Sequence, residues 1–428
     1  MLLYSWLGII LLSYANKMLR QVHIFLEYMD KSIHARKLTG GLSIPKWFRL
    51  FHHHLTLLTM GMVAAFFLGV IPYRPDLNPN GNPVGVDFHY YVEWVTPMLQ
   101  RPFGDALSYA MGPADSGSRP LILIPIYLAA LSRLVSIVQV VEALAAILGP
   151  LLVLSIFIFA REFFQSSKLA GIAALVTAFS FNITVGIWAG YYANMLALAI
   201  GYLFLTVLVR YYRQRSHARL VLLCIGSLAL LLSHPLTWLI ILVTVSVFAF
   251  ATWMQNHDFT LTRLVILLVA LDLFIDVIRT LIFGGEVSSQ ATLGVFVPGR
   301  AVNEIPNLWT QIVNGLFIPY DGLLTNTLIL SLSLIGIASL ALRHNVPKRL
   351  LIIWIAISSI PIFVLAPLLL TRVLYDLPIS ILTMIGLVAI MAHASPGRLL
   401  SHLVFLLVML ALANYAFRAV TNLVAMPF

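Results

Sequence analysis

Runs of about 20 apolar residues recur along the whole 428-residue chain, and this pattern limits its fold more than any other feature. Each run is long enough for a helix to cross the hydrocarbon core of a bilayer. Lipid offers the backbone no hydrogen-bond partners, so a spanning segment must be a helix or a strand of a closed barrel. The runs lack the alternation of apolar and polar residues that barrel strands show. The sequence therefore predicts an all-α integral membrane protein.

We expect about twelve transmembrane helices, from these segments: 1–18, 52–72, 137–160, 168–187, 193–211, 220–234, 236–253, 262–283, 324–342, 350–370, 374–394 and 398–418. The first segment has neither a basic leader nor a small-residue cleavage site, so we treat it as a span and not as a signal peptide. Segment 120–132 is too short to cross and is expected at the membrane interface. The chain then divides into an N-terminal span with a basic linker (1–51) and a polytopic domain (52–428), with external loops 73–118 and 284–323.

Charge is scarce and unevenly placed. Charged residues make up 10% of the chain, against about 25% in soluble domains. Basic residues cluster at 17–49, 210–219 and 343–349, which fall on one side of the membrane if there are twelve spans. The positive-inside rule makes that side cytoplasmic. The net charge of +10 is then explained by topology and by attraction to anionic lipid, and nucleic-acid binding is not expected. The single Cys224 excludes a disulfide framework and a cysteine-based metal site.

The segment 85–95 follows a predicted span directly and opens the first external loop. It contains Asp87, His89, Tyr90 and Tyr91 within five residues. A carboxylate held just above the bilayer suits proton-transfer or metal chemistry on a lipid-borne substrate. The alternative is an amphipathic helix that lies on the membrane surface with its polar side in water.

Other polar residues are expected at the same outer level. His234 and Pro235 separate two short spans, and we expect a tight hairpin there, because a single kinked span would move the basic 343–349 cluster to the outer side. The remaining candidates are Arg119, Tyr191, Tyr192, Asn194, Arg279 and Arg372.

These candidates have structural alternatives. Tyr191 and Tyr192 could anchor the chain in the aromatic belt. His234 could cap a helix end. Asp276 and Arg279, within one span, could form an ion pair, because ionisable residues in a membrane usually face a cavity or a partner.

Several of these motifs together resemble the GT-C superfamily of membrane glycosyltransferases, which take sugar from a polyprenyl-phosphate or polyprenyl-diphosphate donor on the extracytoplasmic side. The resemblance rests on Asp87 with Tyr90 and Tyr91, on segments 117–121, 188–194 and 233–237, and on Arg372 at the start of a late span. It covers nearly the whole chain. The chain differs from the oligosaccharyltransferase catalytic subunit, since it shows neither that protein's large soluble domain nor its sequon-reading motifs.

The resemblance implies roles for the candidates. Asp87 would act as general base on the acceptor or as a ligand of a divalent metal (Mg or Mn), with Asp105 or Asp115 as further candidate ligands. The leaving phosphate needs positive charge, which Arg372 would supply first, followed by Arg119 and Arg279.

The other candidates would bind substrate: His89, Tyr90, Tyr91, Tyr191, Tyr192, Asn194 and His234. The partners implied are the lipid bilayer, a polyprenyl-linked sugar donor and an acceptor that the sequence does not identify, in a multi-pass protein of the cell membrane.

Two other classes of function are open from the sequence. One is a non-catalytic membrane subunit of a larger complex, in which the outer loops dock partners. The other is a lipid or solute transporter, although the sequence lacks the repeated halves typical of that class. An enzyme is expected to bring Asp87, His234 and Arg372 together in one cavity above mid-membrane, whereas a docking subunit is expected to leave them apart and to bury its outer loops against partners.

Overall fold

The computed structural model describes residues 53–112, 119–284, 327–341, 346–359, 372–393 and 398–422. The first predicted span, the basic linker and most of the second external loop lie outside these residues. Within the described ranges all regular secondary structure is helical. The predicted all-α class is confirmed.

Six helical segments of the described chain are long and apolar enough to cross a membrane: α3 (His54–Val70) continued by η2 (Ile71–Tyr73), α7 (Ile137–Phe164), α8 (Ser167–Ala178) together with α9 (Phe181–Ala189), α10 (Tyr192–Arg213), α12 (Pro235–Asn256) and α21 (Arg398–Asn422). Four shorter apolar helices join them: α6 (Pro120–Leu131), α11 (His217–Ser233), α17 (Thr327–Ala341) and α20 (Ile379–His393). A multi-pass membrane protein is thus supported, but about twelve spans are not confirmed.

Two further helices explain part of this difference. Helix α13 (Thr260–Phe283) is long enough to span, but it carries Arg263, Asp272, Asp276 and Arg279 along its length. Of the predicted segment 350–370, the structure describes residues 350–359, which lie in helix α18 (Val346–Ser359). The number of spans stays a prediction.

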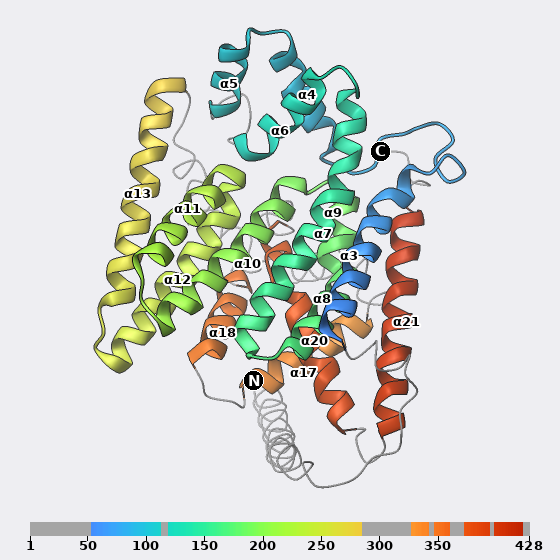
Figure 1. Ribbon diagram of the computed structural model, residues 1–428, viewed down its shortest axis with the longest axis vertical. Helices are drawn as coiled ribbons and strands as arrows, with labels where there is room; N and C mark the ends of the chain where they lie inside the picture. The colour runs from blue at the N-terminus through green and yellow to red at the C-terminus, as the bar shows by residue number, and fades with distance from the viewer. Residues whose placement is uncertain are drawn as a thin grey trace, which may run out of the picture.

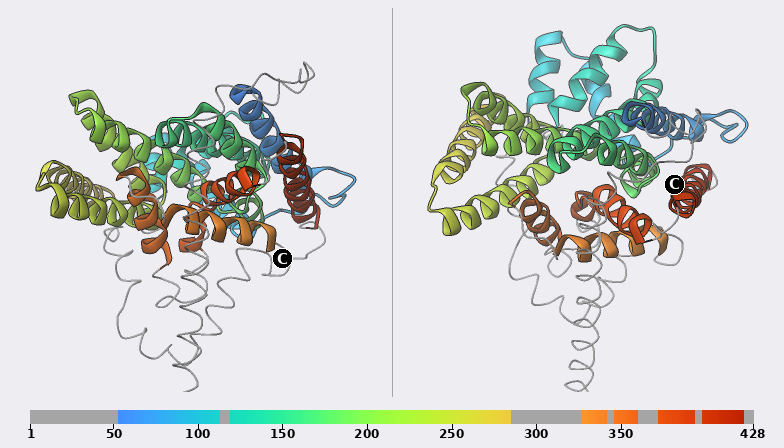
Figure 2. Two further views of the ribbon diagram at one scale, coloured as in Figure 1. Left: turned by 90° about the horizontal axis from the view of Figure 1, so that it is seen from below. Right: turned by 60° about the horizontal axis from the view of Figure 1, so that its bottom comes forward.

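The long helices form a bundle, and three short helices lie across one of its ends: α4 (Phe88–Leu99), α5 (Phe103–Met111) and α6 (Figure 1). Helices α17, α18 and α20 form a layer on one side of the bundle, where α17 crosses α20 and α18 packs on α12 (Figure 2). The predicted surface helix after Asp87 and the predicted interfacial segment 120–132 correspond to α4 and α6.

Small residues allow the backbones of the first helices to approach closely. A Cβ on Gly69 of α3 would lie 2.6 Å from the backbone nitrogen of Ala146 in α7. A Cβ on Gly149 would lie 3.3 Å from the backbone oxygen of Ala65. Such contacts between small residues are typical of helices that associate in lipid, where burial of apolar surface gives no driving force.

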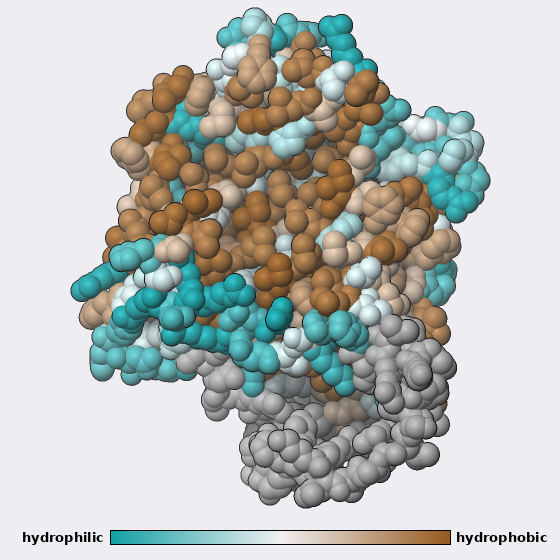
Figure 3. All heavy atoms as spheres, in the orientation of Figure 1, coloured by the Kyte–Doolittle hydropathy of each residue, from teal (hydrophilic) through white to brown (hydrophobic). Residues whose placement is uncertain are grey.

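Charged side chains gather at the end of the bundle opposite α4, α5 and α6. Glu162 forms ion pairs with Arg210 (2.8 Å) and Arg213 (2.6 Å), and Arg215 pairs with Asp258. The space-filling view shows this hydrophilic region below a broad hydrophobic band (Figure 3). The predicted basic turn 210–219 and Asp87 therefore lie at opposite ends of the protein, and the assignment of the basic end to the cytoplasm stays a prediction.

Candidate functional site

The backbone around Asp87 is held against the turn between α9 and α10. The Asp87 N–H donates to the carbonyl oxygen of Ala189 (2.9 Å). Gly85 and Gly190 both have positive φ (112° and 66°), and a Cβ on Gly85 would lie 3.0 Å from Gly190 Cα. Side chains at these two positions would be strained and would push the segments apart. The glycine pair therefore fixes the place of Asp87.

The Asp87 side chain reaches a residue 285 positions away in the sequence. Asp87 occupies the N-cap position of α4, but its side chain makes no capping hydrogen bond. Arg372 Nη2 donates instead to Asp87 Oδ2 at 2.7 Å, and the two side chains are 20% and 9% exposed. Such a partly buried, charge-assisted pair is stronger than an exposed one. It joins the segment before α4 to the helical turn 372–375, which precedes α20 (Ile379–His393).

The position of Arg372 depends on a reciprocal pair of hydrogen bonds a few residues further along. The Tyr375 hydroxyl donates to the carbonyl oxygen of Asn182 (2.5 Å), and Asn182 Nδ2 donates to the carbonyl oxygen of Tyr375 (2.9 Å). Both side chains are fully buried. These bonds fasten the segment that carries Arg372 to α9.

A second arginine lies near the ion pair. Arg119 precedes α6, and its guanidinium carbon is 5.0 Å from the centroid of the Trp94 ring. The guanidinium carbon of Arg372 lies 5.3 Å from the Tyr191 ring. Arg119 Nε is buried and has no hydrogen-bond partner within the described residues. The site thus holds two guanidinium groups beside aromatic rings and one carboxylate, Asp87.

Burial and the neighbouring positive charges shift the pKa of Asp87 in opposite directions. Burial raises the pKa of the Asp87 carboxyl, while the positive charges of Arg372, Arg119 and His89 lower it; the net pKa is above the usual range for aspartate. Burial also lowers the pKa of the Arg119 guanidinium. A carboxylate whose pKa is moved towards neutrality is suited to accept a proton in a reaction.

A chain of buried polar side chains lies next to this group. Asn194 Nδ2 is 3.3 Å from His234 Nδ1, which is 3.0 Å from Thr237 Oγ1; Thr237 Oγ1 is 3.1 Å from Asp376 Oδ1. All four residues are buried. Asp376 follows Arg372 by four residues, so this chain of contacts reaches the segment that carries the ion pair. The predicted hairpin at His234 is confirmed, and His234 also caps α12, as the structural alternative held.

The tyrosines and His89 of the prediction divide into buried and exposed groups. Tyr91 and Tyr192 are fully buried with ring centroids 5.4 Å apart, and the Tyr91 hydroxyl accepts a hydrogen bond from the Ala193 N–H (3.0 Å). They hold α4 on α10. His89 and Tyr90 are exposed, and their rings lie 4.0 Å apart. Of the predicted substrate-binding residues in this segment, His89 and Tyr90 are therefore the ones that face solvent.

Arg279 belongs to a different part of the protein. Its Nη2 donates to Asp276 Oδ1 (2.6 Å), one turn earlier in α13, and both side chains are buried. The ion pair is therefore present, but within one helix. Asp272 accepts hydrogen bonds from Ser227 and from Trp238 Nε1 (2.8 Å), which ties α13 to α11 and α12. The charges that act on Asp87 do not include Arg279.

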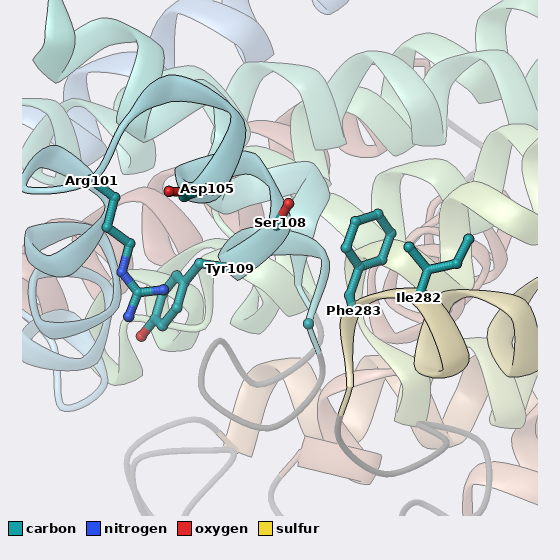
Figure 4. A pocket seen from close by; sticks show the side chains of 7 residues that line it. Arg101, Asp105, Ser108, Tyr109, Ile282 and Phe283 are labelled. Atoms are coloured by element: carbon teal, nitrogen blue, oxygen red, sulfur yellow. The ribbon is translucent and has the colours of Figure 1, made fainter.

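The metal expected from the resemblance finds no ligand set in the described part of the chain, where no three His, Cys, Asp or Glu side chains come together. Asp105 lies instead in a cavity of about 390 Å³ between α5 and the end of α13, lined also by Arg101, Ser108, Tyr109, Gly112, Ile282 and Phe283 (Figure 4). Asp115 lies outside the described residues. The donors near Asp87 do not fit a divalent cation, and metal dependence stays a prediction.

Comparison with solved structures identifies the fold. The archaeal oligosaccharyltransferase AglB from Archaeoglobus fulgidus, in complex with an inhibitory peptide and a dolichol-phosphate, matches 89% of this chain with a TM-score of 0.57 and 15% sequence identity. AglB is a member of the GT-C superfamily. The chain has a GT-C-type fold. It spans 56% of the length of AglB. No protein-family model matches the sequence, and neither does the sequence of any curated protein.

Within this GT-C-type fold, the structure brings together residues that the sequence suggested separately. Asp87 and Arg372 form an ion pair, and the charge of Arg119 acts on both Asp87 and His234.

Sequence reasoning missed three residues of this region: Trp94, Thr237 and Asp376. Spacing gave a signal for the first two. Trp94 lies four residues after Tyr90 on one face of α4, and Thr237 lies at the capping distance from His234.

Proposed function

We propose that the protein is a membrane glycosyltransferase that moves a sugar from a polyprenyl-phosphate donor to an acceptor on the extracytoplasmic side. The observation that carries the proposal is the ion pair between Asp87 and Arg372, with Arg119 beside it. It places a carboxylate and two guanidinium groups at one end of a membrane bundle. The fold supports the same class of reaction, since AglB was solved with a dolichol-phosphate.

Asp87 acts as the general base in this proposal. An acceptor hydroxyl attacks the anomeric carbon of the sugar, Asp87 takes the hydroxyl proton, and the bond between the anomeric carbon and the phosphate oxygen breaks. The raised pKa of Asp87 makes its carboxylate a better base than an exposed aspartate. The proton remains on Asp87 until solvent removes it.

The two arginines stabilise the leaving group. The polyprenyl phosphate departs with negative charge on its oxygens, and positively charged donors that are already in place lower the energy of that state. Arg372 uses one of its five N–H groups on Asp87, so other donors are available for phosphate oxygens. Arg119 Nε has no partner among the described residues and can serve in the same way.

The test is sugar transfer in membranes from cells that express the full chain. The donor is a polyprenyl phosphate that carries a radioactive sugar, and the assay measures label lost from the donor. We expect Asp87→Asn to slow transfer by about 10²–10⁴-fold, the usual share of a general base, and Asp105→Asn in α5 to leave it close to wild type. Undiminished transfer by Asp87→Asn at equal protein level removes Asp87 as the base.

A further inference from the structure

His234 is held by three groups that converge on one nitrogen of its ring. Thr237 N–H and Asn194 Nδ2 each lie 3.3 Å from Nδ1, and Thr237 Oγ1 lies 3.0 Å from it. A backbone N–H can only donate a hydrogen bond, so Nδ1 must be an unprotonated acceptor. The neutral ring then carries its proton on Nε2.

The hydroxyl of Thr237 extends this argument to Asp376. The hydroxyl has one hydrogen and lies within hydrogen-bond distance of both His234 Nδ1 (3.0 Å) and Asp376 Oδ1 (3.1 Å). If the Thr237 hydroxyl donated its hydrogen to Asp376, a lone pair of Thr237 Oγ1 would face the lone pair of His234 Nδ1, which is unfavourable. Both distances are satisfied when Thr237 donates to Nδ1 and a protonated Asp376 donates to Thr237.

The surroundings of Asp376 favour the protonated form. The residue is fully buried, and its Oδ2 has no hydrogen-bond partner within the described residues. An ionised carboxylate with an unpartnered oxygen is very unfavourable in such a place, and the group keeps a proton instead. A protonated acid satisfies Thr237 without a buried charge.

The free edge of the His234 ring adjoins the arginines. Nε2 lies across the ring from the contacts to Nδ1, and no hydrogen bond to it is formed within the described part of the chain. Burial lowers the pKa of His234, and the positive charges of Arg119 and Arg372 lower it further, so a second proton on the ring is disfavoured. His234 is thereby kept as a neutral N–H donor beside two guanidinium groups, an arrangement that suits an anion.

We propose that protonated Asp376, acting through Thr237, holds His234 in the Nε2–H form, so that His234 donates a hydrogen bond to a phosphate oxygen of the lipid-linked donor between Arg119 and Arg372. Asp376 and Thr237 are positioning residues; His234 is the group that touches the ligand. The identity of the ligand rests on the proposed function, whereas the proton positions on His234 and Asp376 do not.

Two spectroscopic measurements test the proton positions, on the full chain in lipid nanodiscs. Ring-¹⁵N NMR, with the His234 signals assigned by their loss in His234→Gln, should show an unprotonated Nδ1 and a protonated Nε2. Infrared absorption should show a protonated carboxyl band that Asp376→Asn removes. A protonated Nδ1, or the same carboxyl band in both proteins, overturns the inference.

A titration tests the ligand contact. Addition of polyprenyl phosphate should shift the Nε2 signal and leave Nδ1 in place, and the uncharged polyprenol is the control. We also expect His234→Gln, which can place an amide N–H near the position of Nε2, to transfer sugar at least tenfold faster than His234→Phe. An unmoved Nε2 signal with bound polyprenyl phosphate overturns the contact. Full transfer by His234→Phe, while Asp87→Asn slows it strongly, overturns this inference and leaves the proposed function intact.

Discussion

Replacement of Arg372 by glutamine should make Asp87 harder to ionise. The two side chains are joined at 2.7 Å and are 20% and 9% exposed, so an effective dielectric constant of about 20 applies. Two unit charges about 4 Å apart then interact by about 4 kcal/mol. After Arg372 is replaced, Arg119 and His89 still stabilise the ionised form of Asp87, so only part of this interaction energy is lost. A change of about 1–3 pH units in the pKa of Asp87, equal to about 1.4–4 kcal/mol, is therefore expected.

The direction of the effect follows from the charge. Burial already raises the pKa of Asp87, and loss of the Arg372 charge raises it further. A base works in its ionised form, so transfer is present above this pKa and is lost as the pH falls through it. The acid limb of the rate against pH should therefore move to higher pH by about 1–3 units in Arg372→Gln.

The assay is the initial rate of sugar transfer from about pH 4 to pH 9 in liposomes, a range that brackets the usual pKa of aspartate and neutrality. Arg101→Gln is the matched control, because Arg101 lies in the same outer layer, stacked 4.3 Å from the Tyr109 ring. Its acid limb should coincide with that of the wild type. An unmoved acid limb in Arg372→Gln would refute the electrostatic coupling between Arg372 and Asp87.

Three further predictions concern the supports of the site. Gly190→Ala should lower the unfolding temperature and reduce transfer severalfold, because φ is 66° and the Cβ would lie 3.2 Å from the Asp87 nitrogen. Gly81→Ala is the control, since Gly81 has a similar φ of 62° but open space around it. It should lower stability by about 1 kcal/mol and leave transfer unchanged. Tyr375→Phe should destabilise the protein by about 1–3 kcal/mol, because it removes the buried hydrogen bond from the Tyr375 hydroxyl to the Asn182 carbonyl oxygen. Thermal unfolding in detergent measures this loss, and Tyr212→Phe, the control, should have little effect. Asp272→Ala should lower the unfolding temperature more than Tyr375→Phe, because it leaves two buried donors unpaired; equal stability of the Asp272→Ala protein would contradict the role given to this carboxylate.

The sequence predicted local structure well where the pattern was local. Apolar runs gave the helical class, and the polar segment after the second predicted span became the helix that Asp87 begins. His234 with Pro235 gave the hairpin, because proline at the first position of a helix needs no backbone N–H. The break near Ser180, which divides the segment 168–187 between α8 and α9, was not predicted, because apolar residues continue on both sides of it.

Pairing across the fold was not predictable from the sequence. Asp87 and Arg372 were both expected at the outer level, but their contact depends on the packing of α4, α9 and the segment around Tyr375. Asp276 and Arg279 gave an equally strong signal, yet they pair with each other within α13. Charge in a membrane indicates that a partner exists, and only the packing of the helices decides which partner it is.

The central claim is that Asp87 and Arg372 form one catalytic site. It is tested most directly by the transfer rates of Asp87→Asn, Arg372→Gln and the double variant, compared in the same liposomes. Residues that act as a unit have strongly non-additive effects. We predict that the double variant is no slower than the slower of the two single variants. Losses that multiply, so that the double variant falls by the product of the single effects, would show that the two residues act independently and would contradict the claim.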